Sequence, residues 1–379
     1  MSNYTYLDHA ATTPMRDEAV RAMLPYLSEQ FANPAGSHRF ARAARAAIDD
    51  ARDSVAEVIG CAPGEVIFTS GGTEGDNTAV LGTVARRGGT AVCPAAEHHA
   101  VLASVEQVHG AVVPVTRTGA VDLEVLAHTL RNTADVSVVS VMAVNNEVGS
   151  VNDLAAVASV VREHAPNAVL HTDAVQAPCW VDLRTITPHV DMLSLSAHKF
   201  GGPKGVGVLV ARNGSSFAPM VIGGGQERER RSGTQNVPGI VALAEALRLT
   251  HLERADEQVR LAALRDRLVD TLLAELPGVH ETVPRDQKVA GSAHVCIEGI
   301  ENEALLFLLD EASVCASAAS ACASGAMEPS HVLAAMGVSR DLAFGALRLT
   351  LGRATVPADV DRGAEAVVQA VRRLRKVAL

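Results

Sequence analysis

The stretch Val190-Asp-Met-Leu-Ser-Leu-Ser-Ala-His-Lys-Phe-Gly-Gly-Pro-Lys-Gly205 contains an alternating apolar run followed at once by a glycine-rich turn. The run 190–196 predicts a buried strand, and the glycines and proline after it predict the turn. Lys199 stands at the end of this strand, where burial would lower the pKa of its amine and free the lone pair. Taken alone, a loop lysine is more often an ordinary solvated residue, so the rest of the chain decides what Lys199 does.

Further short apolar runs predict more strands along the first half of the chain, at 65–70, 89–94, 136–142, 168–173 and 206–210. The apolar spacing over 39–59 predicts an amphipathic helix that Gly60 ends. Strands that alternate with helices predict βαβ units and a largely parallel sheet, and hence an α/β fold. Ligands of such sheets bind beyond the carboxyl ends of the strands. Thr73, Asn146, Asp173 and Lys199 all fall at such ends.

Residues 239–276 are rich in Ala, Leu, Arg and Glu, with neither Gly nor Pro after Gly239. This composition predicts one long helix. We expect the helix to join a large domain at 14–254 to a smaller α+β domain, which is formed by 1–13 and 255–379.

Residues 313–327 are almost all small. Such a segment is typical of a tightly packed turn or of a flexible loop, and a loop can also carry chemistry. Pro329 predicts the first position of a helix that ends near Gly337.

The chain has 379 residues and a formal net charge of −10, which disfavours nonspecific binding to nucleic acid or to an anionic membrane. It contains no apolar run of the ~18 residues that a membrane span needs. The N-terminus lacks a basic patch followed by an apolar core, so we expect no signal peptide and a cytoplasmic location. None of the six cysteines forms a Cys-x-x-Cys pair, and we expect reduced thiols and no metal site.

Several residues would suit one cofactor, pyridoxal 5′-phosphate (PLP), which needs a Schiff-base lysine and an acidic or basic partner for its ring nitrogen. Asp173 ends a buried strand and could be that partner, although a helix N-cap is its common alternative role. Gln176 could donate to the phenolic oxygen of the cofactor. The glycine turn that contains Gly72 and Thr73 could hold a phosphate or be only a structural turn.

Other residues offer acid–base or nucleophilic chemistry. An imidazole at His98 or His99 could stack on a flat ring or move protons near neutral pH. Cys322 in the small-residue loop is the candidate nucleophile; Cys315 is a second candidate, and an inert buried thiol is the alternative for each. Arg348 has apolar neighbours and is predicted to lie on a strand, where it could clamp a carboxylate or form an internal salt bridge.

Residues 223–234 combine glycines, arginines and hydroxyls. The composition suits an anion-binding loop that reaches across a dimer interface, or a solvated charged loop.

Taken together in this order, these motifs resemble the class V aminotransferase-like PLP enzymes, and most closely the cysteine desulfurases of the long-loop branch. The resemblance implies the fold of the fold type I PLP-dependent transferases, with 313–327 as the catalytic cysteine loop. It covers nearly the whole chain and is carried by the segments 6–14, 69–77, 97–98, 145–149, 173–176, 196–205, 231–234, 320–325, 328–331 and 348–353.

The resemblance also implies a role for each site residue. Lys199 would carry the Schiff base, His98 would stack on the ring and assist proton transfer, and Cys322 would be the nucleophile. Asp173 would hold the ring nitrogen and Gln176 the phenolic oxygen. The phosphate would be held by Gly72, Thr73, Ser196 and His198, together with Thr234 of the partner subunit, and the substrate carboxylate by Asn146 and Arg348.

The activity implied is conversion of L-cysteine to L-alanine, with the sulfur transferred to Cys322 as a persulfide and then to an acceptor protein. Iron–sulfur cluster assembly and tRNA or DNA thiolation use this donor chemistry, and a homodimer is expected. The alternatives are a selenocysteine lyase, another fold type I PLP enzyme, or a non-catalytic scaffold that keeps the fold.

Overall fold

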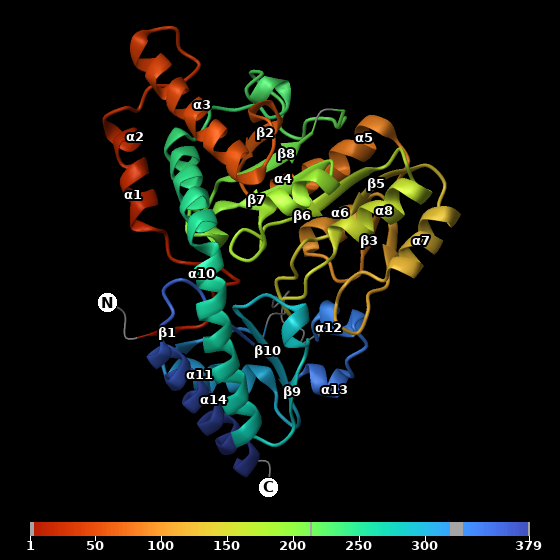
Figure 1. Cartoon of the computed structure of the whole chain (residues 1–379), viewed down its shortest axis with the longest axis vertical. Coiled ribbons are helices and arrows are strands. Elements are labelled where there is room, and N and C mark those ends of the chain that lie inside the picture. Colours follow the sequence, from red (N-terminus) through yellow and green to blue (C-terminus); the bar gives the residue numbers. More distant parts are fainter. Residues whose placement is uncertain (1–3, 213, 319–328, 378–379) are drawn as a thin grey trace.

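The computed structural model describes residues 4–212, 214–318 and 329–377 (Figure 1). Its larger sheet has seven strands in the order β2-β8-β7-β6-β5-β3-β4. The strands from β4 to β7 run parallel, whereas β8 is antiparallel to both β7 and β2. The predicted α/β class with a mostly parallel sheet is therefore confirmed. The strands are β2 (Val66–Thr69), β3 (Thr90–Pro94), β4 (Ala111–Val113), β5 (Val136–Ser140), β6 (Val169–Asp173), β7 (Met192–Ser196) and β8 (Gly207–Ala211).

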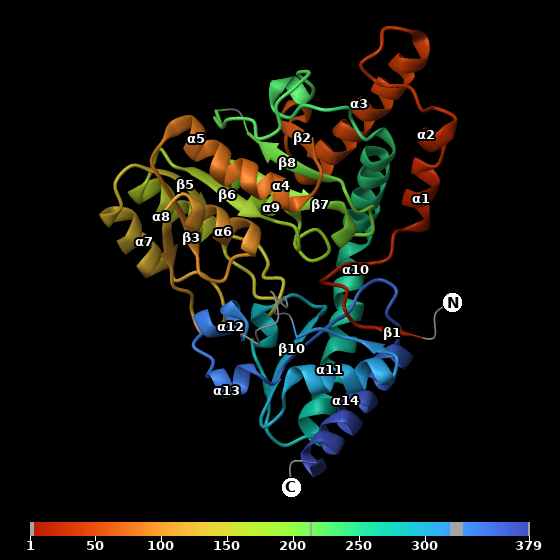
Figure 2. The same cartoon turned by 180° about the vertical axis from the view of Figure 1, so that it is seen from behind.

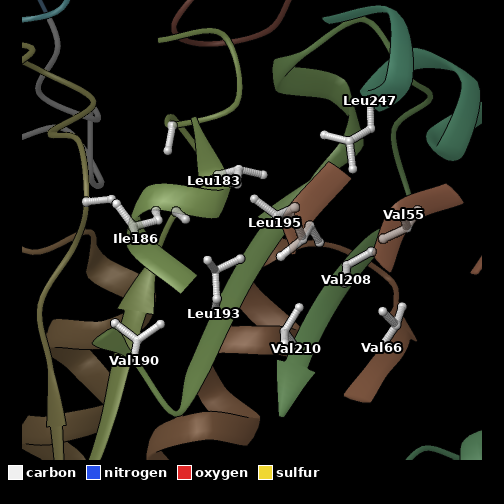
Figure 3. Packing of buried hydrophobic residues seen from close by; sticks show 14 of the residues in the cluster. Val55, Val66, Leu183, Ile186, Val190, Leu193, Leu195, Val208, Val210 and Leu247 are labelled. Atoms are coloured by element: carbon white, nitrogen blue, oxygen red, sulfur yellow. The ribbon is translucent and has the colours of Figure 1, made fainter. Parts of the chain in front are cut away.

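Apolar side chains bury both faces of this sheet. Leu193 and Leu195 of β7 point to one face, where they pack with Val208, Val55 and Leu247 (Figure 3). Met192, the residue before Leu193, points the other way and joins the core of the opposite face. The first face is covered by α3 (Arg39–Ile59), α7 (Leu123–Asn132), α8 (Leu154–His164) and α9 (Leu183–Ile186), and the second by α4 (Gly72–Asn77), α5 (Thr83–Arg87) and α6 (His99–Gln107).

One helix, α10 (Val237–Glu275), runs through the whole molecule (Figures 1 and 2). Its first half packs against the large sheet with Leu243 and Leu247, and its second half contributes Leu261 and Leu268 to a separate apolar core. The two cores support a division of the chain near the middle of α10, and the boundary at 254/255 stays a prediction. Short helices α1 (Asp17–Met23) and α2 (Pro25–Ser28) lie beside the first half of α10.

The second core lies between helices and a three-stranded antiparallel sheet of order β12-β10-β9. The strand β1 pairs in parallel with β11 and also lies beside the C-terminal helix α14 (Figure 2). The elements are β1 (Thr5–Tyr6), β9 (Val279–Glu281), β10 (Ser292–Ile297), α11 (Asn302–Glu311), β11 (Val314–Cys315), α12 (His331–Ala335), α13 (Arg340–Ala343), β12 (Ala346–Thr350) and α14 (Pro357–Val377).

Most predicted elements are confirmed, and two details differ. The helix predicted to start at Pro329 begins at His331, because Ser330 is its N-cap: the Ser330 hydroxyl accepts hydrogen bonds from the Val332 and Leu333 amides. The three-residue β4 was not predicted, since its apolar run is too short to show a period. Within the described residues, no helix combines the length and the apolar character needed to cross a membrane.

Candidate active site

A cavity of about 580 Å³ lies beyond the carboxyl ends of β5, β6 and β7, where the N-terminal segment and β12 close over the sheet. Most of the predicted site residues line it: Gly72, Thr73, His98, Asn146, Asp173, Gln176, Ser196, His198, Lys199 and Arg348. The two other predicted residues need separate mention. Thr234 is exposed on a surface loop, and Cys322 lies outside the described residues.

Lys199 projects from the turn that follows β7. Its Nζ donates hydrogen bonds to the backbone carbonyls of Ala10 (2.5 Å) and Ala11 (2.9 Å). Burial lowers the pKa of Lys199 to about 8, and the positive charge of Arg348 acts in the same direction. The amine therefore loses its proton at a lower pH than an ordinary lysine, as a nucleophilic or basic lysine requires.

Two carboxyl groups and one imidazole form the floor of the cavity. The side-chain ligand atoms of Asp76, His98 and Asp173 lie within 4.8 Å of one another. Burial raises the pKa of both acids, although the nearby imidazole and Lys199 partly offset this at Asp173. Asp173 accepts a hydrogen bond from the Val175 amide (2.9 Å), which orients its carboxyl group. Two acids and an imidazole could also bind a divalent cation, so the absence of a metal stays a prediction.

His98 is both the N-cap of α6 and part of the cavity wall. Its Nδ1 accepts a hydrogen bond from the Ala100 amide (3.1 Å), so Nε2 carries the proton in the neutral ring. Burial lowers the pKa of His98, although the residue as a whole is exposed and lines the cavity. The preceding Glu97 points inward and accepts from the Met142 amide (2.7 Å).

A neutral histidine lies beneath the floor. His171 is fully buried on β6 and lies between the hydroxyls of Ser140 (2.8 Å) and Ser194 (2.9 Å). Burial lowers its pKa to about 3, so the ring is uncharged. Its Nε2 is 3.6 Å from Asp76, which is too long for a hydrogen bond.

Small residues shape the opposite end of the cavity, beside Thr73, Ser196 and His198. A Cβ on Gly207 would lie 2.5 Å from the Leu195 carbonyl and 2.7 Å from the Gly71 backbone. The absence of a side chain thus lets β8 approach the turn that begins α4. His198 is held by Thr12, whose hydroxyl lies 3.2 Å from Nδ1.

Arg348 lies on β12, on the side of the cavity away from the large sheet. Its side chain is 6% exposed. One terminal nitrogen donates to Asp8 (2.8 Å) and the other to the backbone carbonyl of Asn146 (2.9 Å). Arg348 thus forms the salt bridge that was the alternative to carboxylate binding, and it also lines the cavity.

The side-chain amide of Gln176 already has a hydrogen-bond partner within the chain. Its amide donates to the Ala10 carbonyl (2.8 Å), the same oxygen that Lys199 contacts.

Residues that the sequence analysis did not single out complete the rim. The Ser330 hydroxyl donates to Glu147, and burial raises the pKa of that carboxyl to about 7. His331 Nε2 donates to the Glu97 carbonyl (2.9 Å), and its ring lies 4.5 Å from that of His99. Cys315, the second candidate thiol, lies half-buried on β11, and burial raises its pKa.

The loop that carries Thr234 has an unusual backbone. Glu227, Arg228 and Glu229 have φ values of 48°, 58° and 65°, which residues other than glycine rarely adopt. The Glu227 carboxylate is buried and accepts from both terminal nitrogens of Arg52, at 2.8 Å each, and from the Phe68 amide (3.1 Å). This buried ion pair holds the left-handed turn in place.

The fold and the site together define a class of protein. Residues 5–362 match the family model described as Aminotransferase class-V, and the chain belongs to this family. Its relatives place it among the cysteine desulfurases, as the motifs predicted. A cysteine desulfurase IscS of Methanosarcina thermophila is 40% identical over 380 residues, which cover 98% of this chain and 93% of the relative.

Solved structures agree with this assignment. A NifS-like protein overlaps with a TM-score of 0.91 at 32% identity and covers 98% of this chain and 100% of its own. A structure described as SspA in complex with cysteine overlaps with a TM-score of 0.78 at 29% identity, with 93% and 99% covered. The predicted fold, that of the fold type I PLP enzymes, is thereby confirmed.

Proposed function

We propose that the protein is a PLP-dependent cysteine desulfurase that converts L-cysteine to L-alanine and receives the sulfur on Cys322 as a persulfide. One observation carries the proposal: a single cavity holds a desolvated lysine, a buried acid and a buried arginine. These are the groups needed to bind PLP at one end and an amino-acid carboxylate at the other.

The residues present fit PLP. Lys199 offers a neutral amine, and the buried Asp173 carboxyl would gain a cationic partner from a protonated ring nitrogen. His98 would lie against the ring, and Gln176 would leave Ala10 to reach the phenolic oxygen. The phosphate would be held by Gly72, Thr73, Ser196 and His198, with Thr234 of the partner subunit. When bound, PLP would act as an electron sink, which takes up the electron pair left on the substrate Cα when its proton is removed.

The side chains divide the chemistry between them. Arg348 and Asn146 would hold the substrate carboxylate, which places the Cα hydrogen near Lys199. Lys199 would take that proton, because its lowered pKa makes it a base near neutral pH. The Cys322 thiolate would then attack the substrate sulfur, so that a sulfur–sulfur bond forms as the carbon–sulfur bond breaks.

We propose a cytoplasmic homodimer that hands the persulfide to an acceptor protein. Iron–sulfur assembly and tRNA or DNA thiolation remain the candidate destinations. A selenocysteine lyase, another fold type I PLP enzyme and a non-catalytic scaffold are the alternatives that experiment must exclude.

Alanine and sulfide release from L-cysteine, with a reductant present, tests the function. The wild type should release both in equal amounts. Cys322→Ser should keep the cofactor and lose sulfur transfer. The matched variant Cys315→Ser should keep both the cofactor and sulfur transfer. Lys199→Ala should lose the visible absorption of bound PLP.

Two other results would favour a different function. Sulfide release that survives in Cys322→Ser would favour a lyase or Cys315 as carrier. A wild type that stays colourless with added PLP would favour the scaffold.

A further inference from the structure

We propose that Asp8 is a positioning residue for substrate binding: it orients Arg348 and, by its negative charge, limits the affinity of Arg348 for the substrate carboxylate. The proposal rests on the function proposed above, in which Arg348 holds that carboxylate.

Two contacts fix how Arg348 presents its donors to a substrate. One N–H of each terminal nitrogen is engaged, by Asp8 at 2.8 Å and by the Asn146 carbonyl at 2.9 Å. The remaining nitrogen, Nε, is buried and has no hydrogen-bond partner among the described residues. A guanidinium has five N–H donors, so one N–H on each terminal nitrogen is left for the cavity. Asp8 and Asn146 therefore determine which edge of Arg348 a ligand meets.

Asp8 contacts Arg348 from outside the cavity lining. Arg348 lines the cavity, whereas Asp8 is not among the lining residues. A carboxylate that enters the cavity thus meets the guanidinium from one side while Asp8 already contacts it from another. The two anions share one cation, and repulsion between them weakens the binding of the second.

The backbone around Asp8 is fixed to the strand that carries Arg348. Leu7 accepts from the Thr350 amide (2.7 Å), and the His9 amide donates to the Thr350 carbonyl (3.3 Å). Tyr6 adds a bond from its hydroxyl to the Asp8 carbonyl (3.1 Å). These bonds hold the Asp8 backbone beside β12, which keeps its carboxylate within reach of Arg348.

The same segment also contacts the lysine. Ala10 and Ala11, two and three residues after Asp8, accept the hydrogen bonds of Lys199. A substitution at Asp8 must therefore be compared with one that keeps the local geometry. Asp8→Asn does so, because its carbonyl oxygen can still accept from Arg348 while the charge is removed. Asp8→Ala removes both the charge and the acceptor.

The test uses 3-mercaptopropionate, which has the carboxylate and thiol of cysteine but no amine. Its dissociation constant is measured by calorimetry on the cofactor-free protein, and its inhibition constant on the holoenzyme. Asp8→Asn should tighten both about 3- to 10-fold, and Asp8→Ala should weaken both by about tenfold, the scale of one hydrogen bond to a charged group. The KM for L-cysteine should follow the same directions, with kcat changed less.

Two controls separate charge at this site from other effects. Cysteamine, which lacks the carboxylate, should compete equally well against the wild type and Asp8→Asn. Asp361→Asn removes the acid of an exposed pair with Arg267 and should leave every constant unchanged.

Unchanged or weaker binding of 3-mercaptopropionate by Asp8→Asn would overturn the proposal. If Asp8→Ala fails to fold, Asp8→Asn decides the question by itself. If the wild type releases no alanine from L-cysteine, the proposed function fails, while the calorimetry on the cofactor-free protein still tests Asp8.

Discussion

Lys199 shows how burial changes the chemistry of one residue. We expect its amine in the cofactor-free protein to react with formaldehyde under reductive methylation with a midpoint near pH 8, where burial places its pKa, rather than near ~10.4 as in a free lysine. Because the lowered pKa favours the neutral form, reactivity should be lost as the pH falls below 8. The signal is assigned by its absence in Lys199→Ala, and a midpoint near that of free lysine would contradict the effect of burial.

Whether a site residue could be predicted depended on how far along the chain its contacts reach. Lys199 and Asp173 could be predicted because each ends a strand whose apolar pattern is local. Asp8 could not, since its partner Arg348 is 340 residues away. Asp76 and Glu147 also carry no local signal; their importance comes from burial beside other charged groups.

Among the elements, β8 and the turn before α4 depend on each other through Gly207. Gly207→Ala should destabilise the protein by about 1–3 kcal/mol, the usual cost of overpacking, because the new methyl group would overlap the Leu195 carbonyl and Gly71. It should also weaken PLP binding by moving Gly72 and Thr73. Denaturant unfolding and a PLP titration measure the two effects.

The matched control for this substitution is Gly64→Ala, whose added methyl group would meet nothing within 4 Å. PLP binding that stays unchanged in Gly207→Ala would show that β8 does not position the turn.

Elements in which the apolar pattern repeats over many residues were predictable, and short elements were not. The helix predicted over 39–59 is α3, and that over 239–276 is α10 within two residues at either end. β4 and the start of α12 depend on pairing with β3 and on the Ser330 cap. Pairing and capping are decided by contacts that the apolar pattern does not contain.

For the whole molecule, α10 is the main connection between the two apolar cores. Ala255 is exposed on this helix, between Leu247 of one core and Leu261 of the other. Ala255→Pro should cost about 3 kcal/mol or more, because proline removes a helical hydrogen bond and clashes with the preceding turn. The two cores should then unfold in separate transitions with urea.

Ala255→Gly is the milder control, with an expected cost of about 1 kcal/mol and one cooperative transition. A single transition in Ala255→Pro would show that other contacts couple the cores.

The left-handed turn at 227–229 has a consequence for the proposed homodimer. Arg52 and Glu227 hold it from within a single chain, so its shape exists before any second subunit arrives. A preformed surface loses less conformational entropy on association than a loop that must first order. In the homodimer proposed above, with this loop at the interface, two separated chains would need only to meet in the correct orientation, and the rate of reassembly would follow diffusion and concentration rather than a refolding step.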